Sequence, residues 1–60
     1  MKTHVYLNDG RVFYFGDTLR IFNNQHTHTY DITYRYVETE EISMKAFYFD
    51  EVAQIVVRGS

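Results

Sequence analysis

The sequence predicts a small all-β domain, and three observations lead to that prediction. The dipeptide Asp9-Gly10 lies between two apolar runs, Val5–Leu7 and Val12–Phe15, which is the pattern of a tight β-hairpin. β-branched and aromatic residues continue along the rest of the chain, and proline is absent. No segment shows the long periodic spacing of an amphipathic helix. We therefore expect residues 1–60 to form one antiparallel β domain.

The first hairpin has two possible registers. A two-residue loop pairs Leu7 with Val12 and mixes small and aromatic side chains on both faces. A three-residue loop with Gly10 as a bulge instead gathers aliphatic and phenylalanine side chains on one face and leaves Tyr6 and Tyr14 on the side open to water, and we prefer this register. It places Val5, Leu7, Phe13 and Phe15 on the core face, and His4, Tyr6, Val12 and Tyr14 on the other face.

Two further strands follow the dipeptide Gly16-Asp17, which predicts a turn. The first, Thr18–Phe22, is expected to point Leu19 and Ile21 inward and to end at the polar residues 23–25. The second begins near His26 with the clearest period-two alternation of the chain. One face carries His28, Tyr30, Ile32, Tyr34 and Tyr36; the other carries Thr27, Thr29, Asp31, Thr33, Arg35 and Val37. A strand of about ten residues is long enough to bend between two sides of a barrel or roll.

The last third of the chain predicts a hairpin, a short helical turn and a final strand. Residues 38–41 are an acidic turn, so the second hairpin is centred near Thr39 and a strand follows over residues 42–49. Residues 50–52 indicate a helical turn with Asp50 as its cap. Residues 53–57 form the final strand. The expected fold is a small five- to six-stranded antiparallel SH3-like barrel or curled meander sheet with a single short helical turn.

Size and charge narrow the functional classes. A chain of 60 residues buries only about 60% of its unfolded surface, so its net stability is about 3 to 5 kcal/mol. Cysteine is absent, which removes disulfides and thiolate zinc sites as a source of further stability and leaves oligomerisation or a partner. The net charge of −2 argues against a basic field for nucleic acid. No apolar run approaches the roughly 20 residues that span a bilayer, and we expect a cytoplasmic protein with no membrane contact.

Two segments resemble the Sm-like family of RNA-binding β-barrels. Val5–Arg11, with Gly16 and Leu19 after it, is similar to the family's strand, Asn/Asp-Gly-Arg turn and Gly-x-Leu segment. Ile55–Gly59 is similar to its Ile-x-x-Arg-Gly ending. The layout also resembles short bacterial and phage β-proteins that begin with a Leu-x-Asp-Gly hairpin. The first resemblance implies a small barrel that binds RNA, whereas the second implies no activity.

Catalytic and metal-binding patterns are weak. His26 and His28 would share one face of a strand and could supply two nitrogens to a metal, with His4 or Asp31 as a third ligand. However, Asp31 has the opposite parity, so we expect no metal site and no cofactor. The chain has no cysteine and no Gly-x-Ser-x-Gly sequence, so we do not expect an enzyme.

Protein binding is the function that the composition favours. Six tyrosines and five phenylalanines exceed what so small a core can hold, and exposed tyrosine is typical of interfaces. We expect a protein–protein binding module, an inhibitor or accessory factor of bacterial or phage type that also self-associates as a homo-oligomer. Its expected contact residues are Tyr6, Tyr14, Tyr34, Tyr36 and Arg35. The alternative is a nucleic-acid binding protein in which tyrosines stack on bases and arginines meet phosphates.

Overall fold

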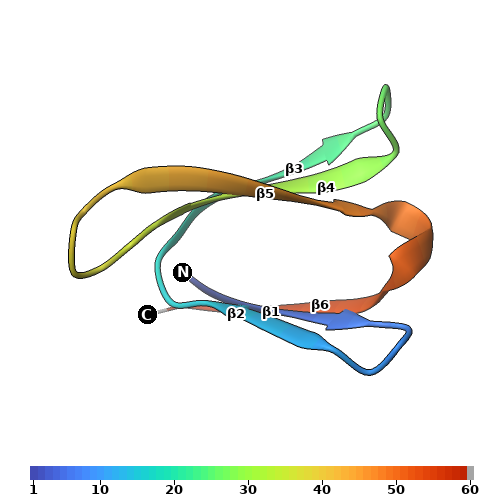
Figure 1. Cartoon of the computed structure of the whole chain (residues 1–60), viewed down its shortest axis with the longest axis horizontal. Helices are drawn as coiled ribbons and strands as arrows, with labels where there is room; N and C mark the ends of the chain where they lie inside the picture. The colour runs from blue at the N-terminus through green and yellow to red at the C-terminus, as the bar shows by residue number, and fades with distance from the viewer. Residues whose placement is uncertain (60) are drawn as a thin grey trace.

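The fold consists of six strands and one 3₁₀ turn, arranged as two three-stranded antiparallel sheets (Figure 1). The computed structural model describes residues 1–59. The strands are β1 (Lys2–Leu7), β2 (Val12–Phe15), β3 (Thr18–Asn24), β4 (Thr29–Arg35), β5 (Ile42–Tyr48) and β6 (Val52–Arg58), and the 3₁₀ turn η1 spans Phe49–Glu51. The all-β prediction is therefore confirmed. None of these elements in residues 1–59 is a helix able to cross a membrane.

The two sheets lie as layers one above the other (Figure 1). One has the strand order β2-β1-β6 and the other the order β3-β4-β5. A bend at Gly16-Asp17 carries the chain from β2 to β3, and η1 carries it from β5 to β6. Among the described strands no ladder joins the two sheets, so closure into a barrel stays a prediction.

The first hairpin adopts the preferred register. Val5 pairs with Phe13 and Tyr6 with Val12, which leaves a three-residue loop over residues 8–10. Gly10 has a φ of 93°, a left-handed conformation that costs glycine little. The Asp9 carboxylate accepts hydrogen bonds from the Arg11 N–H (3.0 Å) and the Arg11 Nε (2.8 Å). The turn is thus stabilised by its own side chains.

The core lies between the two sheets and is small. Val5, Leu7 and Phe15 from the first sheet meet Ile32 and Phe47 from the second. The rings of Phe15 and Phe47 pack edge to face with their centroids 6.2 Å apart. Partly buried side chains surround these five: Phe13, Ile21, Tyr34, Val52 and Ile55.

The prediction that Leu19 points inward is wrong. The pairing of β3 with β4 shifts by one residue between Thr18 and Arg20, so a β-bulge falls at Leu19 and its side chain is exposed. Such an extra residue reverses the alternation on one side of the bulge. Thr18 is buried and Ile21 packs against the core, so the inward direction predicted for Ile21 is confirmed.

The prediction of a long bent strand from His26 is also wrong. Residues 25–28 form the turn between β3 and β4, and β4 begins only at Thr29. His28 has a φ of 57°, and the Asn24 side-chain oxygen accepts the N–H groups of His26 and Thr27. His26 and His28 therefore do not share a strand face.

The prediction that Asp50 caps the helical turn is wrong. At η1 the N-cap is Tyr48, and the Glu51 carboxylate accepts the Tyr48 N–H at 3.1 Å.

Candidate functional site

An open groove lies where the end of β2 meets the end of β4. Its volume is about 440 Å³. Four of the five predicted contact residues line it, namely Tyr14, Tyr34, Arg35 and Tyr36. The other lining residues are Phe13, Phe15, Gly16, Val37 and Lys45. We call this site the tyrosine groove. The bend at Gly16-Asp17 creates it, because that bend brings the edge of one sheet beside the last residues of β4.

Tyr34 and Tyr36 form the centre of the groove. Their rings are edge to face at 5.4 Å and their hydroxyl oxygens are 3.3 Å apart. Tyr34 is half-buried because its ring also packs on Phe15 at 4.7 Å, whereas Tyr36 is 51% exposed. The hydrogen bond between the hydroxyls lowers the pKa of Tyr34, with help from Ser43 and the charge of Lys45, and it raises the pKa of Tyr36.

Arg35 fixes the bend against β4. Its backbone N–H donates to the Asp17 carbonyl oxygen at 2.9 Å, and its Nε donates to Asp17 Oδ2 at 2.8 Å. The hydrogen bond and the charge of Asp17 raise the pKa of Arg35. Because this guanidinium already faces a carboxylate, its structural role is to position the groove.

Tyr14 and Tyr6 extend the aromatic surface along the first sheet. Tyr14 is 54% exposed, and its ring covers Gly16, where an added Cβ would lie 3.6 Å from the ring. The His4 ring lies between the two tyrosines, 4.7 Å from Tyr14 and 6.1 Å from Tyr6. Tyr6 is thus separate from the groove and connected to it through His4.

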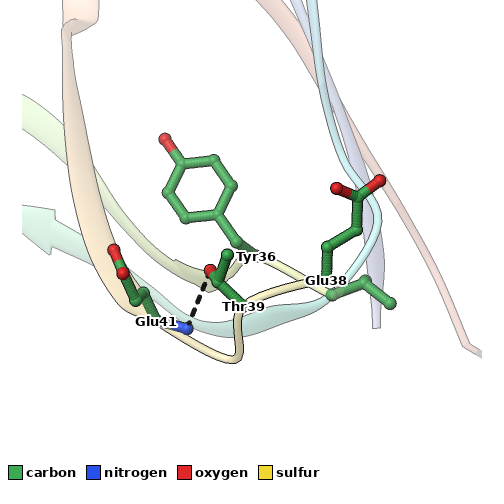
Figure 2. A pocket seen from close by; sticks show the side chains of 5 residues that line it. Tyr36, Glu38, Thr39 and Glu41 are labelled. Atoms are coloured by element: carbon green, nitrogen blue, oxygen red, sulfur yellow. Dashed lines mark hydrogen bonds between the residues drawn. The ribbon is translucent and has the colours of Figure 1, made fainter.

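A second hollow adjoins the groove at the β4–β5 loop. It is lined by Tyr36, Val37, Glu38, Thr39 and Glu41, and Figure 2 shows the Tyr36 ring standing between the side chains of Glu38 and Glu41. The Thr39 hydroxyl accepts the Glu41 N–H at 3.4 Å, and Glu40 has a φ of 61°. Tyr36 and Val37 belong to both hollows, so the groove has an acidic side.

The residues considered for a metal do not come together. His26 and His28 are in the β3–β4 turn, His4 is on the first sheet and Asp31 is on the second. In the part of the chain that the structure describes, no three histidine or carboxylate side chains gather as a set of metal ligands.

Sequence reasoning missed three members of the aromatic surface: His4 as a contact residue, Lys45 and Val37. The signal for His4 was present, because His4, Tyr6 and Tyr14 share one face in the preferred register. Lys45 had no such signal in the sequence. It pairs with the buried Ile32, and its ammonium nitrogen lies 5.2 Å from the centroid of the Phe13 ring. Comparison with protein-family models, curated proteins and solved structures gave no match.

Proposed function

We propose that this protein is a non-enzymatic protein-binding module whose tyrosine groove takes an apolar or aromatic side chain of a partner. The observation that carries the proposal is the meeting of Tyr14, Tyr34 and Tyr36 around one open groove. Aromatic side chains that line a pocket at an interface contribute much of the binding energy, because they bury a large area with few rotamers. The size and composition of the chain support an inhibitor or accessory factor that acts in the cytoplasm of a bacterium, including one infected by a phage.

The charges beside the groove support a peptide with a basic residue. Glu38 and Glu41 lie on either side of Tyr36, and carboxylates in that place repel phosphate groups. Arg35 is paired with Asp17, and Arg11 is paired with Asp9 at the far end of the first hairpin. A lysine or arginine that follows the apolar side chain of the partner would find opposite charge at this loop. RNA binding, the alternative, has weaker support because the arginines are not gathered at the groove.

The strand order supports an SH3-like arrangement as the scaffold for this groove. The strands that follow one another pair as β1–β2, β3–β4 and β4–β5, and the final strand, β6, returns to pair with β1. We propose that the two sheets form an open version of such a barrel, with the groove at the corner where β2 bends into β3.

A peptide library displayed on phage tests the binding proposal. We expect the wild-type chain to select peptides that contain an apolar or aromatic residue next to lysine or arginine. We expect the Tyr34→Ala and Tyr36→Ala variants to bind the selected peptides at least about tenfold more weakly. Tyr48→Ala is the matched control, because Tyr48 is as exposed as Tyr36 but pairs with Thr29, at the end of the same sheet that lies away from the groove.

A short single-stranded RNA is the contrasting probe. Equal peptide binding by the wild-type chain and both groove variants would contradict the proposal. Binding of the RNA with strong weakening by salt, together with no selected peptide, would favour the alternative function instead.

A further inference from the structure

The outer face of the β3-β4-β5 sheet is a second exposed surface, distinct from the tyrosine groove. Strand pairing arranges its side chains in three rows across the sheet. The rows are Arg20, Thr33 and Met44; Phe22, Asp31 and Ala46; and Asn24, Thr29 and Tyr48. Alternation sends the intervening residues, Ile21, Ile32 and Phe47, into the core.

Large apolar side chains occupy much of this face. Phe22 is 44% exposed, Met44 60% and Tyr48 61%. Single exposed apolar residues are ordinary on protein surfaces, but several on one sheet face indicate an interaction surface. Ala46 lies between Met44 and Tyr48 along β5, and these three side chains line an open hollow together with Thr27, Thr29 and Asp31.

One cation and one anion lie among these apolar groups. The Arg20 guanidinium is held 4.8 Å from the centroid of the Phe22 ring. The Asp31 carboxylate accepts hydrogen bonds from Asn24 Nδ2 at 3.0 Å and from Thr29 Oγ1 at 2.7 Å. The two ion pairs formed within residues 1–59 are Arg11–Asp9 and Arg35–Asp17, and neither includes Arg20 or Asp31. Both charges are therefore oriented, and neither forms an ion pair with another residue in the range 1–59.

We infer that this face binds the same face of a second copy of the chain across a two-fold axis, so that Arg20 of each copy meets Asp31 of the other. A two-fold interface is self-complementary, and a contact between two different positions of one face occurs in it twice. The axis lies between the faces and bisects the line from Arg20 to Asp31. The same packing buries Phe22, Met44 and Tyr48. This inference does not rest on the proposed function, because the face and the groove share no residue.

The size of the face sets the strength of the dimer. Three strands of seven residues cover about 23 by 14 Å at the usual rise and spacing. Such a footprint, about 320 Å² on each copy, is smaller than the roughly 800 Å² per partner of a standard interface, so the dimer is weak and reversible, with a dissociation constant of about 100 µM. The charged pairs fix the orientation of the two copies more than they add affinity.

Sedimentation equilibrium of the full chain over a range of about 1 µM to about 1 mM tests the inference. We expect the wild-type mass to rise with concentration to twice the monomer mass. Arg20→Asp leaves two anions on the face and Asp31→Arg leaves two cations, so each variant alone should dimerise at least about tenfold more weakly. An equimolar mixture of the two variants should form heterodimers, because both contacts then join opposite charges.

Three further variants make the test specific. Arg58→Asp reverses an exposed charge on β6 of the other sheet and should leave the mass unchanged. Met44→Glu should weaken the dimer without removing the hydrogen bonds of Asp31, so the test survives if Asp31→Arg fails to fold. Tyr36→Ala should dimerise like the wild type, which separates this inference from the proposed function.

Several outcomes would overturn the inference. One is a wild-type chain that keeps the monomer mass throughout the range. Another is a dimer that persists in Arg20→Asp and Met44→Glu, or a mixture of the two charge variants that contains no more dimer than each alone. Loss of the dimer in Tyr36→Ala but not in Arg20→Asp would assign self-association to the tyrosine groove instead.

Discussion

Two buried threonines illustrate how single hydroxyl groups join the two sheets. The Thr3 and Thr18 hydroxyl oxygens are 2.8 Å apart, and both residues are buried. Thr3 belongs to β1, and Thr18 begins β3 in the other sheet. The Thr18 N–H also donates to the Met1 carbonyl oxygen at 2.8 Å. These bonds hold the corner that the sheets share beside the bend.

We expect Thr3→Val to lower the free energy of unfolding by about 1 kcal/mol, because it removes the shorter bond of the buried Thr18 hydroxyl and leaves only the 3.4 Å bond to the Phe15 carbonyl oxygen. The double variant Thr3→Val/Thr18→Val should lose less than the sum of the two single changes, since it removes both polar groups together. Urea unfolding of the four proteins measures this cycle. Strict additivity would mean that the two hydroxyls do not interact.

The Asp31 carboxylate links stability to pH. Its hydrogen bonds from Thr29 and Asn24 lower the pKa of this group in the folded state. A lowered pKa contributes stability that is present above the unfolded-state pKa and is lost as the pH falls through the folded-state pKa. Asp31→Asn should therefore be less stable than the wild type at about pH 6, and the difference should shrink toward about pH 2.

Urea unfolding at both pH values measures that difference for Asp31→Asn. Glu38→Gln is a suitable control because this carboxylate lies in the β4–β5 loop and accepts no hydrogen bond from the rest of residues 1–59. A difference for Asp31→Asn that is constant with pH would show that the carboxylate contributes through its shape rather than its charge.

At the scale of the element, the first hairpin depends on the backbone conformation of Gly10. Its φ of 93° is one that L side chains rarely adopt, and an added Cβ would meet nothing within 4 Å. Gly10→Ala should therefore destabilise the protein by about 1 kcal/mol through backbone strain alone. Gly59→Ala, which is equally free of contacts, should have no effect. Thermal unfolding of both variants measures the difference, and equal midpoints would exclude such strain.

Sequence reasoning succeeded where an element is determined by its own residues. The turn chemistry of Asp9-Gly10 and the parity of Val5 and Phe13 were enough to predict the register of the first hairpin. The acidic second hairpin was also predicted near its observed centre, since Arg35 pairs with Ile42. In both hairpins the strands that pair are neighbours in the chain, so short-range patterns carry the information.

The errors arose where tertiary packing decided the local structure. The bulge at Leu19 accompanies the burial of Thr18 at the bend, and no period-two pattern encodes it. The alternation through His26 and His28 continued into a turn, because alternating histidine and threonine suit a turn as well as a strand. The sequence also indicated the tyrosines of a candidate site, but only the bend at Gly16-Asp17 brings Tyr14 beside Tyr34 and Tyr36.

At the scale of the whole molecule, stability is limited by the size of the core. Among residues 1–59, five apolar side chains are buried, whereas twelve large hydrophobic side chains remain exposed. Burial of such residues between two copies stabilises the folded state, because a partner that binds only the folded chain shifts the unfolding equilibrium. Self-association would therefore supply stability that the small core does not provide.

We therefore expect the urea midpoint of the wild-type chain to rise with protein concentration, whereas that of Arg20→Asp should do so only at higher concentrations. Unfolding curves at about 5 µM and about 500 µM measure the effect. Arg58→Asp should follow the wild type. A midpoint independent of concentration for all three proteins would show that the folded chain is stable as a monomer.

The pairing of β1 with β6 has a consequence for synthesis on the ribosome. Lys2 pairs with Arg58 and Val5 with Ile55, so the central strand of the first sheet receives one of its two neighbours only after residues 52–58 have been translated. Until then Val5, Leu7 and Phe15 of the β1–β2 hairpin lack part of the packing that buries them. The pairing of β1 with β6 closes a long loop, and closure of a long loop slows folding. Newly made chains therefore pass through a stage in which this apolar surface is open to chaperones or to other nascent copies.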